Sequence, residues 1–163
     1  MTMGDFLATI FTGNNLALLG AALATLMSGM GSAKGVNLAG KASAGLLSED
    51  PSKFGKTLVL QALPMTQGIY GFVTGFLILF KMGVLGGTPN LTTEQGGYYL
   101  MASLPIAIVG YYSGIKQGEV AAAGVAVLSK QPKQVGKAIT STALVETYAI
   151  LAVLISLLLI LFS

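Results

Sequence analysis

A single carboxylate inside a long apolar run is the residue of this sequence with the clearest potential for chemistry. Glu146 lies in the run from Ala138 to Ser163, which contains no other charged side chain. A helix over this run, at about 1.5 Å per residue, would cross the hydrocarbon core of a bilayer, which is about 30 Å thick. An unpaired ionisable group inside such a span costs about 2.5 kcal/mol or more. Its presence therefore suggests that Glu146 has a function.

Three further polar side chains are predicted to lie at the depth of Glu146. Counted from the polar turn between the last two apolar runs, Gln117 and Glu146 lie the same number of residues along their helices. Thr66 and Gln67 lie at nearly the same distance from the earlier polar turn, at Pro51. The four side chains could therefore meet at one level inside the membrane.

A proline next to two of these residues adds a backbone oxygen. Pro64 lacks an N–H and leaves a carbonyl about one turn earlier, near Leu60, without its partner. Interrupted helices of this kind line ion sites in membranes. Such a carbonyl and the oxygens of the four polar side chains would form an anionic cage suited to a small monovalent cation. The alternative is that Thr and Gln only hydrogen-bond neighbouring helices to one another.

The composition indicates an integral membrane protein. Of the 163 residues, 53% are hydrophobic and 9% are charged, whereas about a quarter are charged in a soluble domain. The absence of Cys and His excludes disulfides, thiolate sites and the usual zinc sites. The nine basic residues are all Lys, which argues against a nucleic-acid surface built on Arg. The first fifteen residues contain no Lys or Arg, so they do not resemble a cleavable signal peptide.

Four apolar runs separated by polar turns predict an all-α integral membrane fold of four transmembrane helices in two tandem hairpins. Asn14 and Asn15 are expected to cap the first helix. Small residues at every fourth position, such as Gly29 and Ala33, predict close helix packing. The expected division is a short external N-terminus at 1–15, a first hairpin at 16–80, an external connection at 81–97 and a second hairpin at 98–163.

The two hairpins look like one unit written twice. Pro51 and Pro132 lie in corresponding turns and are 81 residues apart. The same offset places Met65 opposite Glu146. The first repeat therefore has a neutral residue where the second has its carboxylate.

The distribution of Lys predicts the orientation, because positive residues favour the cytoplasmic side of a membrane. Six of the nine Lys residues lie near the two hairpin tips, whereas only Lys81 lies in the central connection. We therefore expect a multi-pass protein of the cell membrane, with cytoplasmic hairpin tips and external termini. The sequence assigns no role to Lys34, Lys116 and Glu119. Six Lys residues cluster around the two tips: Lys41, Lys53, Lys56, Lys130, Lys133 and Lys137.

Two other classes of function fit parts of the sequence. An independent small two-repeat ion transporter would place polar residues on several helices, whereas the polar residues outside the tips gather in one cluster. Gly55-Lys56-Thr57 resembles the end of a nucleotide-binding P-loop, but the Gly required five residues earlier is Asp50. The P-loop interpretation therefore fails.

Four segments of the chain, three of which contain Gln67, Gln117 and Glu146, resemble the membrane-ring subunit, or proteolipid, of V-type ATPases. The resemblance is strongest to the sodium-translocating bacterial type. The resemblance covers nearly the whole chain. It implies a ring of identical four-helix subunits that rotates in lipid against a stator subunit with an essential arginine. Other subunits hydrolyse ATP, so this chain would not be an enzyme, and central-stalk subunits would meet the hairpin tips. The segments that carry the resemblance are Gly29–Gly35, Leu63–Tyr70, Ser113–Gly118 and Val145–Ile150.

The resemblance also implies a set of ion ligands. The Tyr70 hydroxyl would hold the carboxylate in a locked state. The Leu63 carbonyl is named by the resemblance alone, since the missing N–H of Pro64 frees a carbonyl nearer to Leu60. The resemblance favours Na⁺ as the transported ion, and the alternative is H⁺, for which Glu146 alone suffices. In the sodium-type members, Na⁺ is held by oxygens that correspond to Glu146, Gln117, Gln67, Thr66 and the backbone carbonyl of Leu63.

Overall fold

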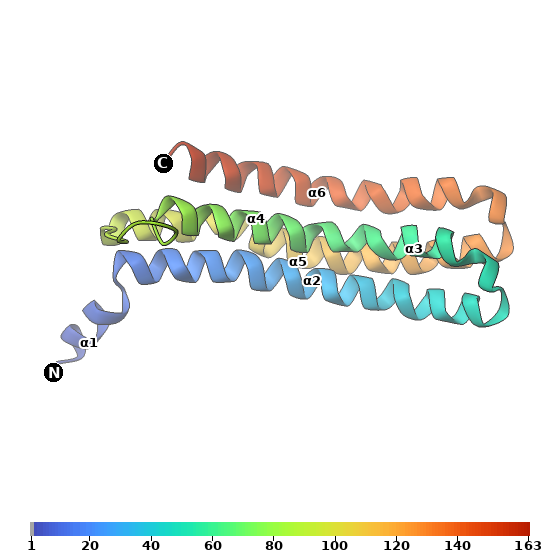
Figure 1. Cartoon of the computed structure of the whole chain (residues 1–163), viewed down its shortest axis with the longest axis horizontal. Helices are drawn as coiled ribbons and strands as arrows, with labels where there is room; N and C mark the ends of the chain where they lie inside the picture. Colours follow the sequence, from blue (N-terminus) through green and yellow to red (C-terminus); the bar gives the residue numbers. More distant parts are fainter. Residues whose placement is uncertain (1) are drawn as a thin grey trace.

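The computed structural model describes residues 2–163, and these residues form a bundle of long helices with one short helix outside it (Figure 1). Four segments within this range are long and apolar enough to cross a membrane, which confirms the predicted fold class. The helices are α1 (Met3–Ile10), α2 (Gly13–Glu49), α3 (Phe54–Ala62), α4 (Thr66–Lys81), α5 (Thr93–Lys130) and α6 (Val135–Leu161), with short 3₁₀ turns η1 (Pro51–Lys53), η2 (Leu63–Met65) and η3 (Pro132–Gln134).

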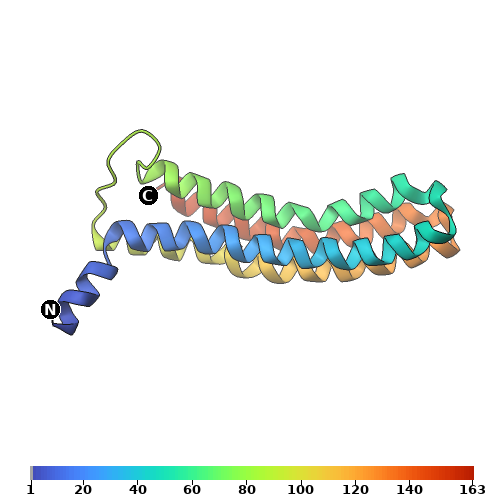
Figure 2. The ribbon, with the colours of Figure 1, turned by 60° about the horizontal axis from the view of Figure 1, so that its bottom comes forward.

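Both hairpin turns lie at one end of the bundle, and the chain termini lie toward the other (Figures 1 and 2). The two turns are built alike. Asp50 and Gln131, each followed by a proline, have φ of −139° and −138° and ψ of 88° and 72°. A proline disfavours the helical conformation in the residue before it. Each long helix therefore ends at the same point of its repeat.

The start of α2 differs from the sequence prediction. Thr12 is the N-cap, and its hydroxyl accepts the Asn15 N–H at 3.3 Å. The prediction that Asn14 and Asn15 cap this helix is wrong, because both side chains have other partners. Asn14 bonds the Pro89 carbonyl at 3.0 Å and the Leu91 N–H at 3.0 Å, and Asn15 bonds the last carbonyls of α1. Asn14 thus ties the start of α2 to the central connection.

The first residues of the chain form the separate helix α1. Thr2 and Asp5 make a reciprocal capping box at its start. The helix leaves the bundle at an angle to α2 (Figure 2), and none of its residues is buried.

The close contact between α2 and α5 depends on glycines. A Cβ on Gly31 would overlap the Tyr111 backbone, and a Cβ on Gly35 would overlap the Gly114 carbonyl. A Cβ on Gly29 would meet no atom within 4 Å, and Ala33 is exposed. Small residues do mediate the packing, as predicted, but Gly29 and Ala33 lie outside this contact. At about 1.5 Å per residue, α2 and α5 are each about 55 Å long, so they extend beyond a hydrocarbon core of about 30 Å.

The second membrane-spanning segment is interrupted at Pro64, as predicted. Helix α3 ends at Ala62, the 3₁₀ turn η2 contains Pro64, and α4 begins at Thr66. The interruption brings backbone groups and two polar side chains to the middle of the bundle.

Candidate ion-binding site

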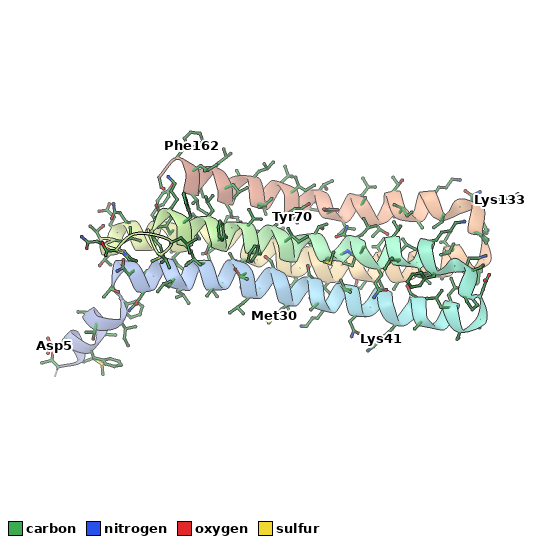
Figure 3. The ribbon with its side chains drawn as sticks, viewed as in Figure 1. Asp5, Met30, Lys41, Tyr70, Lys133 and Phe162 are labelled. Carbon is green, nitrogen blue, oxygen red and sulfur yellow. The ribbon has the colours of Figure 1, made fainter. Side chains whose placement is uncertain are left out.

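Glu146 is half-buried on α6 and contacts residues from both α4 and α5. The Tyr70 hydroxyl donates a hydrogen bond of 2.6 Å to its Oε1. The Gln117 amide nitrogen lies 3.5 Å from its Oε2. Tyr70 lies in the middle part of the bundle, far from Lys133 at the tip (Figure 3). The carboxylate is therefore held between the two repeats, well inside the apolar region.

A pair of buried glutamine side chains lies beside the carboxylate. Gln67 on α4 and Gln117 on α5 are both 0% exposed. The Gln67 amide donates to Oε1 of Gln117 at 2.5 Å and to the Ser113 hydroxyl at 3.2 Å. The Gln117 amide also donates to the Thr142 carbonyl at 3.2 Å. Because a buried amide without partners costs about 1–3 kcal/mol, these bonds fix the two side chains relative to each other.

Thr66 and Leu63 supply further oxygens from the interrupted segment. The Thr66 hydroxyl donates to the Leu63 carbonyl at 3.0 Å and lies 3.5 Å from Oε1 of Gln67. A hydroxyl has one proton, and the shorter bond to Leu63 uses it. The lone pairs of the Thr66 hydroxyl and the carbonyl oxygen of Gln67 could then serve as ligands for a cation.

These oxygens define what the site can bind. Glu146 supplies one negative charge, and the other groups are neutral amide, hydroxyl and carbonyl oxygens, which suit hard cations. Among residues 2–163 there is no group of three or more His, Cys, Asp or Glu side chains that could hold a metal ion. A single monovalent cation would balance the charge of the site.

The structure thus brings the predicted residues Glu146, Gln117, Gln67, Thr66 and Tyr70 into one hydrogen-bonded cluster. Pro64 is buried in the adjoining turn, and the Leu63 carbonyl contacts the cluster through Thr66.

Ser113 is a member of this cluster that was not predicted from the sequence. Its hydroxyl accepts from Gln67 and donates to the Val145 carbonyl at 3.1 Å, so it links α4 to α6 across α5. Ser113 lies one helical turn before Gln117 and therefore on the same face of α5. This spacing could have identified it.

Polar groups outside the site are of two kinds. The prediction that polar residues gather in one cluster is too narrow, because buried Ser28 and Ser156 bond the backbone of Ile106 elsewhere in the bundle. Charged side chains on the other faces of α2 and α5 make their own contacts. Lys34 donates to the Tyr111 hydroxyl at 2.7 Å, and Lys116 forms an exposed ion pair with Glu119 at 3.0 Å.

Comparisons with known proteins agree with this architecture. The family model of the ATP synthase C-subunit matches the chain twice, over residues 19–78 and 100–159. The V-type sodium ATPase subunit K of Enterococcus hirae is 50% identical over 159 residues, which are 98% of this chain and 99% of that protein. The A-type ATP synthase subunit K of Methanocaldococcus jannaschii is 39% identical over 144 residues, 88% of this chain and 61% of that protein.

The fold and the site thus define a class of membrane protein, a helical bundle of two repeats with one carboxylate at its centre. The chain belongs to the ATP synthase C-subunit family. The two family matches begin at residues 19 and 100, a difference of 81, which confirms the repeat offset found in the sequence. The chain is therefore a non-catalytic, multi-pass rotor-ring component of a V- or A-type ATPase, and the interpretation as an independent transporter is not supported.

Proposed function

We propose that this protein carries Na⁺ across the membrane on Glu146 as the ring rotates. The ligands would be the Glu146 carboxylate, the side-chain oxygens of Gln117, Gln67 and Thr66, and the backbone carbonyl of Leu63. Tyr70 would hold the carboxylate in place while the ion is bound.

The observation that carries this proposal is the pair of buried glutamines beside the carboxylate. A proton carrier needs only the carboxyl group, whereas here two paired side-chain amides, Gln67 and Gln117, are 0% exposed, and the amide nitrogen of Gln117 lies 3.5 Å from the Glu146 carboxylate. Buried amides are costly unless they are paired or bind a ligand. The name of the E. hirae relative, a sodium ATPase subunit, supports the same cargo.

The transport step follows from the charge of Glu146. With a cation bound, the site is neutral overall and can pass through lipid at a much lower cost than a free carboxylate. At the stator, an arginine in a water-filled path would pair with Glu146 and favour release of the ion. The Tyr70 bond must open for the carboxylate to meet that arginine, so Tyr70 would act as a latch.

The remaining partners follow from the same proposal. Identical subunits would form the ring, and lipid would surround it. Central-stalk proteins would bind the hairpin tips, which carry Lys53, Lys56, Lys130, Lys133 and Lys137. These positive charges favour cytoplasmic tips and external termini in the cell membrane. The two hairpins, 16–80 and 98–163, would each supply part of every ion site.

Labelling with a carbodiimide tests the proposal. The reagent attacks a protonated carboxyl group, so a sodium ion held by Glu146 should block it in the purified ring. We expect millimolar or lower sodium to protect Glu146, and protection to weaken as the pH falls because protons compete for the carboxylate. Potassium at the same ionic strength is the control for a general salt effect. Labelling that follows pH alone, whatever the sodium concentration, would show that the cargo is H⁺ and that Glu146 acts alone.

A further inference from the structure

The side chain of Ser32 contacts the interrupted segment on both sides of its two polar residues. The Ser32 hydroxyl on α2 accepts the Gly68 N–H at 2.7 Å and donates to the Met65 carbonyl at 3.3 Å. Thr66 and Gln67 lie between these two backbone groups. Ser32 is 6% exposed.

The hydrogen bond from Gly68 to Ser32 lies in the first turn of α4. The first N–H groups of a helix have no acceptor within the helix and are usually satisfied by the side chain of the N-cap residue. The N-cap of α4 is Met65, which makes no side-chain capping bond. Ser32, on a different helix, provides a side-chain acceptor for the Gly68 N–H in this first turn.

The packing around Ser32 allows this close approach. Gly68 has no side chain, and a Cβ there would lie 3.2 Å from the Ser32 hydroxyl oxygen and 3.3 Å from its Cβ. On the next turn of α2, a Cβ on Gly35 would lie 2.8 Å from Cβ of Pro64. Helix α2 therefore packs tightly against the whole interrupted turn.

We infer that Ser32 is a positioning residue for ion binding, which holds the backbone that carries Thr66, Gln67 and the Leu63 carbonyl. This inference rests on the proposed function. Ser32 does not contact Glu146, whose hydrogen bonds come from Tyr70 and Gln117. Loss of the Ser32 hydroxyl should therefore weaken cation binding and leave protonation of the carboxylate nearly unchanged.

Carbodiimide labelling of the purified ring separates these two effects. In Ser32→Ala, we expect the sodium concentration for half protection to rise about tenfold, since two hydrogen bonds that order the ligands are lost. The pH dependence of labelling without sodium should match that of the wild type. Gly68→Ala keeps the hydroxyl but crowds it, so its half-protection concentration should rise as well, by less.

Ser28→Ala is the matched control. Ser28 lies one turn earlier on α2, is 0% exposed, and its hydroxyl donates to the Ile106 carbonyl on α5 at 2.9 Å, away from the interrupted turn. It should bind sodium like the wild type. An equal rise in Ser28→Ala, a shifted pH curve in Ser32→Ala, or unchanged protection in Ser32→Ala would each overturn the inference. If sodium fails to protect even the wild type, the proposed function itself is wrong.

Discussion

The Tyr70 hydroxyl donates a hydrogen bond of 2.6 Å to Oε1 of Glu146, and so joins α4 of the first repeat to α6 of the second. The two residues are 76 positions apart. The carboxylate of the second hairpin is thus held by the first, which explains how a repeat without its own carboxylate can contribute to the site.

Removal of this hydrogen bond should weaken sodium binding. A hydrogen bond to a charged group contributes about 1.5–3 kcal/mol, so Tyr70→Phe should raise the sodium concentration for half protection by about tenfold or more. Carbodiimide labelling across a sodium titration measures the effect. Tyr148→Phe is the control, because Tyr148 lies two residues from Glu146 and is 67% exposed. Equal protection in Tyr70→Phe and the wild type would exclude the latch.

The two glutamines can be tested as ligands or as connectors between helices. Gln117→Leu removes one of the two acceptors of the Gln67 amide and leaves only Ser113, which should cost about 1–3 kcal/mol of stability and abolish sodium protection. In the double variant Gln67→Leu with Gln117→Leu, both polar groups are gone, so the melting temperature should recover while sodium protection stays absent. Sodium protection that survives in the double variant would show that the glutamines only join helices.

The contact between α2 and α5 should not tolerate a methyl group at Gly35. A Cβ there would overlap the Gly114 carbonyl, and overpacking of this kind costs about 1–3 kcal/mol. Gly35→Ala should lower the melting temperature of the ring in detergent. Gly55→Ala is the control, because a Cβ at Gly55 would meet no atom within 4 Å. A melting temperature of Gly35→Ala equal to that of the control would contradict the packing described.

The turn at the first hairpin tip should loosen in acid. Hydrogen bonds from Ser52, together with the nearby Lys53 ammonium, lower the pKa of Asp50 below its ordinary value of 3.8. A carboxyl group whose pKa is lowered by folding stabilises the folded turn above its unfolded pKa, and this contribution is lost as the pH falls through the folded value. Hydrogen-exchange protection of the Ser52 N–H should be constant near neutral pH and fall below about pH 3.8. In Asp50→Ala it should be low throughout, and equal protection in both proteins would count against this role of Asp50.

Much of the fold could be predicted from the sequence because its signals are local. The apolar runs correspond to the four membrane-spanning segments, and Pro51, Pro64 and Pro132 mark the points where the helices end or break. The start of α2 could not be predicted correctly, since Asn14 bonds Pro89 and Leu91, which are distant in sequence. The spacing of small residues also cannot show that Gly31, and not Gly29, packs against α5, because the position of the facing helix decides which of the two lies in the contact.

The site was predictable in part for the same reason. Counting residues from the turns placed Gln117 and Glu146 at one depth, and the structure places their side chains 3.5 Å apart. The contribution of Ser32 depends on how α2 packs against the interrupted turn, and no sequence spacing encodes that contact.

Equilibrium binding of radioactive sodium to the purified ring is the most direct test of the proposed cargo. Binding at neutral pH should saturate at one ion per chain, weaken as the pH falls, and disappear in Glu146→Gln. Absence of saturable binding in the wild type, or binding that persists in Glu146→Gln, would contradict a sodium site built around Glu146.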